Sequence, residues 1–204
     1  MKAIHALIML AAAFTLGGCA TGMSEQACLT ADWRTVGFED GVAGKTPSAI
    51  SYYRNQCADA GVTPDLDEYL AGRTQGLETY CRPANGYRVG ERGGQYHGVC
   101  DASSESDFLA AFNDGRELYI LRRDVNRLER ELDRAEETLI ALETEIATLT
   151  LEAISDGLTP EQRLLLLNQS REATERKQIV EADIITIREE LALSRERLQL
   201  YAAG

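Results

Sequence analysis

Apolar residues recur at alternating spacings of three and four over most of the C-terminal half of the chain. The first series runs from Leu118 to Leu149, and the second runs from Leu166 to Tyr201. This spacing is the heptad pattern of helices that pack side by side in a coiled coil. The two series therefore predict two long helices of about 42–50 residues each, which at 1.5 Å per residue reach roughly 60–70 Å.

The segment between the two series has the residues of a turn between helices. Gly157 suits the left-handed position that follows a helix. Thr159, Pro160 and Gln162 match the N-cap, the first turn and the capping-box position of a new helix. We therefore place the turn near residues 155–160.

The two series keep one register when the second is folded back on the first. Leu149 then faces Leu166, and Leu118 faces Leu198, with the alternation unbroken between them. This predicts an antiparallel coiled-coil helical hairpin over residues 105–204. We also expect charge pairs across it that join Arg123 to Glu190, Arg127 to Glu189 and Arg134 to Glu181.

The expected tip of the hairpin has more apolar residues than the register needs. The seam, which is the line of contact formed by the two apolar series, requires only Leu166 there. The neighbouring apolar residues therefore either close the end of the hairpin or contact a partner. An exposed apolar patch often marks an interface. The candidate partner-docking residues are Leu158, Leu164, Leu165 and Leu167.

The N-terminus has the pattern of an export signal. Lys2 is followed by an apolar stretch of about a dozen residues, which is too short to span a bilayer. The stretch ends in Leu16-Gly17-Gly18-Cys19, which resembles the lipobox of bacterial lipoproteins. The resemblance implies that residues 1–18 are removed and that Cys19 carries the lipid (diacylglycerol and an acyl chain such as palmitate).

The residues after this cysteine bear on the membrane that receives the protein. We expect residues 19–27 to form a lipidated tether. Ala20 rather than an aspartate follows Cys19. By resemblance to lipoprotein sorting, this favours the outer membrane over the inner membrane, with the protein facing the periplasm. The alternative is a soluble secreted protein with an ordinary cleavage site.

Four cysteines remain beyond Cys19, namely Cys28, Cys57, Cys81 and Cys100. An even number in an oxidising compartment predicts two disulfides. A zinc site is the alternative, but no Cys-x-x-Cys pair is present. Sequence alone permits three pairings. We favour Cys28–Cys57 with Cys81–Cys100, because each bond then joins neighbouring segments.

Small residues spaced four apart recur through residues 28–104, which we take as a small Cys/Gly-rich domain. The pattern Tyr69-x-x-Gly72-x-x-x-Gly76 matches Phe108-x-x-Ala111-x-x-x-Gly115, and Gly37 and Gly41 form a related pair. Small residues at this spacing share one helix face and permit close backbone approach. They predict a helical unit used two or three times.

The glycines of residues 85–100 are too dense to favour a helix. We expect turns and a small hairpin there, closed by a Cys81–Cys100 bond. The whole chain is therefore expected to be mainly α, with a small disulfide-stapled helical domain followed by the long hairpin.

Three motifs resemble an uncharacterised lipoprotein family called domain of unknown function 2799. They are Cys28-x4-Trp33-x3-Gly37-x2-Asp40-Gly41-x2-Gly44, Gly72-x3-Gly76-Leu77-x2-Tyr80-Cys81 and Gly86-Tyr87-x2-Gly90-x2-Gly93-x2-Tyr96-x-Gly98-x-Cys100. The resemblance covers about residues 28–120. It supports the lipoprotein interpretation, and it implies no activity, ligand or catalytic residue.

Charge and composition argue against several functions. The formal net charge of -12 argues against nucleic acid as a partner, because phosphate neutralisation needs Lys and Arg. Beyond the export signal the one histidine is His97, and no phosphate-binding loop, zinc-hydrolase or dinucleotide motif appears. Carboxylate-only catalysis, for example by Asp40 and Glu78, stays an alternative. We expect no enzymatic activity, no catalytic or metal-binding residue and no cofactor.

The residues leave two main hypotheses for the function. The first is a structural or adaptor lipoprotein that contacts the membrane through its lipid and a protein partner through its hairpin. The second is a module that binds a ligand or the cell wall through aromatic residues, which would otherwise form the core. Those aromatic residues are Trp33, Tyr69, Tyr87 and Tyr96. Association of two copies through the coiled coil is a further alternative.

Overall fold

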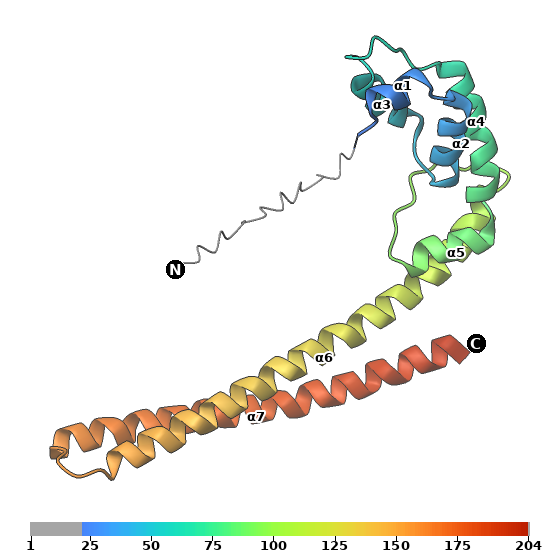
Figure 1. The fold of residues 1–204 in the computed structure, drawn as a ribbon. Coiled ribbons are helices and arrows are strands. Elements are labelled where there is room, and N and C mark those ends of the chain that lie inside the picture. Colours follow the sequence, from blue (N-terminus) through green and yellow to red (C-terminus); the bar gives the residue numbers. More distant parts are fainter. Residues whose placement is uncertain (1–21, 204) are drawn as a thin grey trace, which may run out of the picture. The chain divides into compact units, whose positions relative to one another are not determined.

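The protein is described here by a computed structural model that covers residues 22–203, all of whose regular elements are helices (Figure 1). The elements are α1 (Glu25–Leu29), α2 (Trp33–Val42), the 3-10 helix η1 (Pro47–Ala49), α3 (Ile50–Gln56), α4 (Leu66–Tyr80), α5 (Pro83–Glu91), α6 (Glu105–Ala153) and α7 (Pro160–Ala203). The mainly helical fold agrees with the prediction. The expected signal segment and Cys19 lie outside the described residues.

The chain divides into two compact units, and the division falls inside α4, between Gly76 and Leu77. The first unit contains α1, α2, η1, α3 and most of α4. The second contains the end of α4 together with α5, α6 and α7. From the sequence we expected a boundary near residue 104, between the Cys/Gly-rich domain and the hairpin. The division between the compact units lies elsewhere. Because α5 packs on α6, part of that segment belongs to the same unit as the hairpin.

In the first unit, α2 and α4 approach each other so closely that the glycines at their contact have no room for a side chain. These glycines are Gly37, Gly41, Gly72 and Gly76. A Cβ atom built on any of them would overlap a main-chain carbonyl oxygen of the other helix. The small residues four apart therefore set the distance between the two helices.

The second unit repeats this contact between α5 and α6. A Cβ atom on Gly86 or Gly90 would overlap a carbonyl oxygen of α6, and one on Gly115 would overlap the carbonyl oxygen of Tyr87. In both units a short helix with glycines four apart lies on a longer helix. The longer helix has an aromatic residue seven positions before a contact glycine, namely Tyr69 before Gly76 in α4 and Phe108 before Gly115 in α6. This supports the prediction of a repeated unit and defines the unit as a pair of helices.

Residues 83–91 are helical, so the expectation of turns and a hairpin over residues 85–100 was wrong for its first half. Residues 92–100 have the expected turns but no strands, so no hairpin forms there. Pro83 stands in the first turn, where its missing N–H is not needed. Glycine weakens a helix by about 1 kcal/mol relative to alanine. Gly86 and Gly90 offset this cost because only glycine permits the contact with α6.

The two disulfides join Cys28 to Cys57 and Cys81 to Cys100, which is the favoured pairing. Their Cα atoms lie 5.5 and 5.6 Å apart. The first bond lies within the first unit, and the second lies within the second unit. Each bond therefore closes a loop inside one unit.

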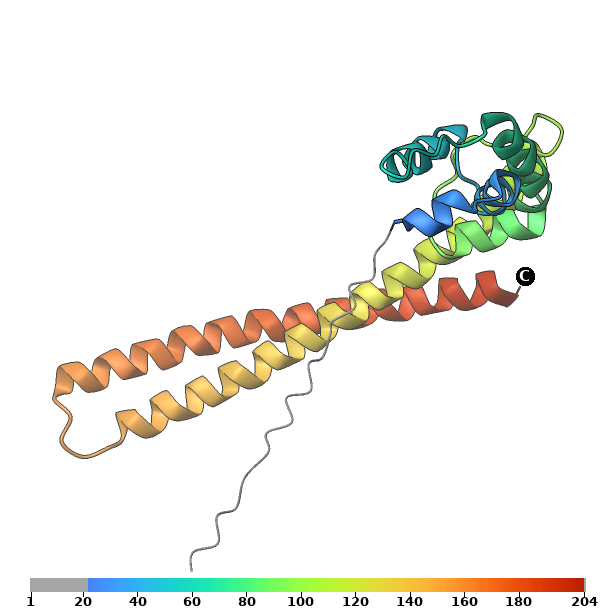
Figure 2. The ribbon, with the colours of Figure 1, turned by 45° about the horizontal axis from the view of Figure 1, so that its top comes forward.

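Helices α6 and α7 form the expected antiparallel hairpin, with the two long helices side by side in both views (Figures 1 and 2). Every residue of the two predicted series from Leu118 to Leu149 and from Leu166 to Leu198 is buried or half-buried. One core cluster contains Val125, Leu128 and Leu191, with Leu132, Ile187 and Leu198 packed around it. These are residues that the predicted register brings together.

The ion pairs across the hairpin differ from the expected ones. Arg123 and Arg127 pair within α6, with Asp124 at 3.3 Å and Glu131 at 3.0 Å. Glu181, the expected partner of Arg134, pairs instead with Lys177 at 3.3 Å. The pairs that do cross the hairpin run from cations of α7 to glutamates of α6. They are Arg176–Glu145 (2.8 Å), Lys177–Glu143 (3.2 Å), Arg188–Glu136 (2.7 Å) and Arg195–Glu129 (2.8 Å).

Within residues 22–203, no helix is both long enough and apolar enough to cross a membrane.

Candidate functional site

The turn at the end of the hairpin has a well-defined backbone. Gly157 takes a positive φ of 85°, as its left-handed position requires. The main-chain N–H of Thr159 donates to Gln162 Oε1 (2.9 Å), and the N–H of Gln162 donates to Thr159 Oγ1 (3.2 Å). The guanidinium of Arg163 donates to the carbonyl oxygens of Ala153 and Ser155. The capping box is therefore confirmed.

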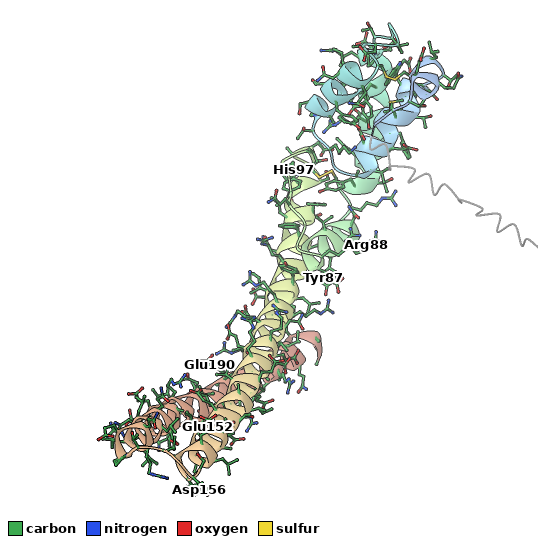
Figure 3. The ribbon with its side chains drawn as sticks, turned by 60° about the vertical axis from the view of Figure 1, so that its left-hand side comes forward. Tyr87, Arg88, His97, Glu152, Asp156 and Glu190 are labelled. Carbon is green, nitrogen blue, oxygen red and sulfur yellow. A yellow bond between two sulfur atoms is a disulfide. The ribbon has the colours of Figure 1, made fainter. Side chains whose placement is uncertain are left out.

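The leucines around this turn face solvent. Leu164, Leu165 and Leu167 are 60%, 58% and 49% exposed, whereas Leu158 is half-buried. Leu151 and Ile154 at the end of α6 are also exposed. Glu152 and Asp156 mark this end of the hairpin in Figure 3. The tip is thus an apolar surface on an ordered turn.

The first unit has a buried carboxylate, Asp40, whose side chain accepts three hydrogen bonds. Lys45 Nζ lies 2.7 Å and the Tyr53 hydroxyl 2.9 Å from Asp40 Oδ1. The Tyr69 hydroxyl donates to Asp40 Oδ2 at 2.8 Å. Arg73, also buried, donates from Nε to the carbonyl oxygen of Lys45 (2.7 Å). This Asp40 cluster joins α2, α3 and α4.

The electrostatics of the Asp40 cluster keep its donors protonated. Burial, followed by the hydrogen bond to Asp40, raises the pKa of both Tyr53 and Tyr69 above that of a free phenol. The hydrogen bond to Asp40 raises the pKa of Lys45. Burial lowers the pKa of Arg73. Tyr53, Tyr69 and Lys45 thus donate to Asp40, whereas Arg73 donates to a main-chain carbonyl oxygen. Glu78, the other carboxylate of the catalytic alternative, is exposed. The arrangement fits a structural tie better than proton transfer.

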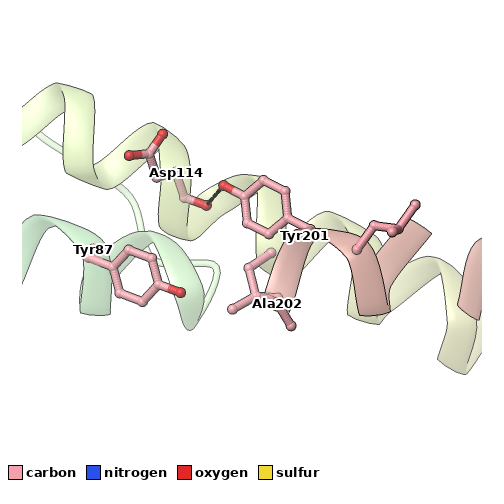
Figure 4. A pocket seen from close by; sticks show the side chains of 6 residues that line it. Tyr87, Asp114, Tyr201 and Ala202 are labelled. Atoms are coloured by element: carbon pink, nitrogen blue, oxygen red, sulfur yellow. Dashed lines mark hydrogen bonds between the residues drawn. The ribbon is translucent and has the colours of Figure 1, made fainter. Parts of the chain in front are cut away.

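A hollow of about 630 Å³ lies where α5, α6 and the end of α7 meet, all within the second unit (Figure 4). Its lining residues are Tyr87, Asp114, Leu118, Leu200, Tyr201 and Ala202. The Tyr201 hydroxyl closes one side by donating to the carbonyl oxygen of Asp114 at 2.8 Å. Burial, then the negative charges of Asp114 and Glu117, raise the pKa of Tyr201.

A second, smaller pocket of about 310 Å³ lies on α6 and is rich in arginine. Its lining residues are Tyr119, Arg122, Arg123, Asn126 and Arg130. Neither this arginine pocket nor the hollow was predicted from the sequence. A signal for the arginine pocket exists, because four of its five residues recur at spacings of four and three on α6.

The aromatic residues of the ligand-binding hypothesis have different surroundings. Tyr69 is fully buried, and Tyr96 packs on Phe108 while donating to Glu105 (2.7 Å). Trp33 is half-buried with its ring 6.2 Å from that of Tyr53. Tyr87 lines the hollow. Tyr69 and Tyr96 therefore serve the cores of their own units.

The loop after α5 carries His97, whose side chain is exposed and is labelled in Figure 3. Among residues 22–203, no three His, Cys, Asp or Glu side chains lie close enough together to hold a metal ion.

Comparison with known proteins finds a family match for one part of the chain. Residues 32–117 match the family described as "Protein of unknown function (DUF2799)". The match runs from the start of α2 into α6 and includes both glycine-mediated helix contacts, so the resemblance stated from the motifs is confirmed. Neither the curated proteins nor the solved structures contain a significant match to the chain.

Proposed function

We propose that this member of the DUF2799 family is an envelope lipoprotein that binds a protein partner with the tip of its hairpin. The Leu16-Gly17-Gly18-Cys19 sequence supports anchoring through a lipid on Cys19. Ala20 supports delivery to the periplasmic face of the outer membrane. The proposal includes no catalytic step.

The observation that carries the proposal is the group of exposed leucines on the ordered turn. Leu164, Leu165 and Leu167 lie outside the seam, so the hairpin does not need them to hold its two helices together. Burying one leucine fully against a partner would contribute about 1.5–3 kcal/mol. Such a group on a fixed backbone fits a binding surface better than a helix end that closes on itself.

The charges around the tip indicate the chemistry of the partner. Glu152, Asp156 and Glu161 are exposed and lie next to the leucines along the chain. Interfaces commonly have an apolar centre and a polar rim. The expected partner therefore offers an apolar groove bordered by basic residues.

Crosslinking in living cells tests the tip. A photoreactive residue at Leu165 should capture one defined protein, and Leu164→Ser/Leu167→Ser should abolish the capture. The matched control is Ile179→Ser/Leu193→Ser, which removes two equally exposed apolar residues of α7 away from the tip. Capture that survives the tip variant, or that fails equally in the control, would reject the proposal.

The anchor is tested separately. Mass spectrometry of the membrane-bound protein should find a chain that begins at Cys19 and carries the mass of the lipid, and Cys19→Ala should remove that mass. Density separation of the two membranes then distinguishes outer from inner. An unmodified Cys19 in the membrane-bound protein would contradict lipid anchoring.

A second candidate function is ligand binding by the hollow, since Tyr87 and Tyr201 place two aromatic side chains in one cavity. Cell-wall fragments are the probe, because the hypothesis concerns an envelope protein. Tyr87→Ala should lower their retention without lowering the free energy of unfolding. Equal retention by both proteins would exclude this function.

A further inference from the structure

The outer face of α6 has a polar stripe that repeats with the period of the seam. Arg116, Tyr119, Arg123, Asn126 and Arg130 follow one another at spacings of three and four. The last four, together with Arg122, line the arginine pocket. Tyr119 and Arg130 are eleven positions apart, so the pocket extends over roughly 17 Å of helix.

The arginine pocket stands out against the charge of the chain, which is -12 overall. Arg122 pairs with Glu91 at 2.8 Å, and Arg123 has a longer contact of 3.3 Å with its neighbour Asp124. Arg130 makes no ion pair with any of residues 22–203. Guanidinium groups of one sign gathered in a concave surface raise the local concentration of anions. Of the three arginines that line the pocket, only Arg130 is not paired with a carboxylate within residues 22–203.

Two contacts with the end of α5 hold the pocket in shape. A Cβ atom on Gly93, which has a positive φ of 72°, would overlap the ring of Tyr119, so the loop lies directly against that ring. The pair between Arg122 and Glu91 holds the neighbouring side chain. A site whose walls are fixed in advance loses less entropy when a ligand binds.

The residues that line the pocket include hydrogen-bond donors suited to an oxyanion. They are three arginines, Asn126 and Tyr119, spread along one face of α6. Arginine forms paired hydrogen bonds with phosphate and carboxylate. A phosphate group offers three terminal oxygens and accepts from several guanidiniums at once, whereas a carboxylate offers two. We propose that the arginine pocket binds the phosphate group of an anionic ligand, either a soluble phosphate compound or a lipid headgroup.

This proposal agrees with the expectation that nucleic acid is not a partner. A long polyanion would meet the negative charge of the whole protein. A single phosphate group is held by contacts much shorter than the screening length of about 8 Å at physiological salt.

Titration of the full chain with pyrophosphate tests the site directly, with binding followed by calorimetry. Arg123→Gln/Arg130→Gln should weaken pyrophosphate binding by at least about ten-fold, because each charge-assisted contact is strong. Asn126→Asp, which adds a negative charge at the same size, should abolish it. The matched control is Arg171→Gln/Arg197→Gln, which removes two exposed arginines of α7 and makes the same change in net charge.

A vesicle assay distinguishes the two sources of phosphate. Vesicles that contain phosphatidylglycerol are compared with vesicles of phosphatidylcholine alone. A lipid on Cys19 or the apolar N-terminus would itself bind vesicles, so the readout is the difference between the two double variants. A loss confined to Arg123→Gln/Arg130→Gln on phosphatidylglycerol assigns a lipid headgroup. Binding of pyrophosphate without that loss assigns a soluble phosphate compound.

Three results would overturn the proposal. The first is binding of neither pyrophosphate nor phosphatidylglycerol vesicles through the pocket. The second is an equal loss in both double variants, which would indicate a general charge effect. The third is oligoglutamate binding as tight as that of pyrophosphate, which would indicate an acidic peptide as the ligand.

Discussion

The hydroxyl of Tyr69 donates a 2.8 Å hydrogen bond to Oδ2 of Asp40, and both residues are almost completely removed from solvent. The two residues lie on α4 and α2, at the contact where glycines bring the helices together. The buried apolar residues of the first unit are few. Buried hydrogen bonds of this kind therefore help to select one packing arrangement of its helices.

Replacing Asp40 by alanine should destabilise the first unit by about 3 kcal/mol, because the buried hydroxyl of Tyr69 loses its acceptor and Lys45 loses its partner. Denaturant unfolding followed by near-ultraviolet circular dichroism measures the loss. Asp59→Ala, at an exposed aspartate of the same unit, is the control and should change stability by less than about 0.5 kcal/mol. Equal effects of the two variants would show that the Asp40 cluster is not a stabilising feature.

Stability of the first unit should fall in alkaline solution. Burial and Asp40 raise the pKa of Tyr53 and Tyr69 above the usual value of about 10, and Asp40 raises that of Lys45. The unfolded chain therefore releases these protons at lower pH than the folded chain. The stabilisation is fully present below about pH 10 and is lost as pH rises further.

The free energy of unfolding measured between about pH 8 and pH 11 checks this expectation. Tyr69→Phe removes one of the titrating groups and should flatten the dependence. A pH dependence that is as steep in Tyr69→Phe as in the unmodified protein would show that other groups cause the alkaline loss.

Alanine at Gly90 should destabilise the contact between α5 and α6 by about 1–3 kcal/mol, because its Cβ atom would overlap the carbonyl oxygen of Phe112. The sign of the change in the free energy of unfolding distinguishes a close helix contact from an open one. In an unhindered helix the same change stabilises by about 1 kcal/mol. Thermal unfolding of Gly90→Ala measures it, and a rise in Tm would contradict the packing described for α5.

The hairpin could be predicted because its signal is local and periodic. A residue such as Leu142 is buried because of its place in a heptad series, and that place can be read from the neighbouring residues. The capping residues Thr159 and Gln162 are equally local. Charge pairs were predicted less well, because nearness along the register does not specify which face of the helix a side chain occupies.

The features that escaped prediction depend on contacts between distant segments. Helix α5 forms although its glycines disfavour a helix, because Gly86 and Gly90 allow it to pack closely on α6. Nothing near Asp40 in sequence identifies Tyr53 and Tyr69 as its donors. The arginine pocket could be predicted in part. The spacing of its residues on α6 is visible in the sequence, but the contact of Gly93 with Tyr119 is not.

Loss of the Cys81–Cys100 disulfide should destabilise the second unit. The bond closes a loop with a sequence separation of 19 residues, which in the chain-entropy model corresponds to about 3 kcal/mol. Cys81→Ala/Cys100→Ala should therefore lower the free energy of unfolding by about that amount while α6 and α7 remain helical. Simultaneous loss of near- and far-ultraviolet circular dichroism in this variant at ambient temperature would contradict the independence of the hairpin from the bond.

Two neighbouring residues of α6 provide a matched test of the seam. Leu142 is 5% exposed and faces α7, whereas Ile140 is 63% exposed on the outer face. Leu142→Ala should cost about 2–5 kcal/mol, because it leaves a cavity between the helices. Ile140→Ala should change stability by less than about 0.5 kcal/mol. Denaturant unfolding of both variants, followed by helical circular dichroism, measures the difference. If Ile140→Ala proved as costly as Leu142→Ala, the outer face of α6 would itself have to be covered in solution, by another part of this chain or by a second copy.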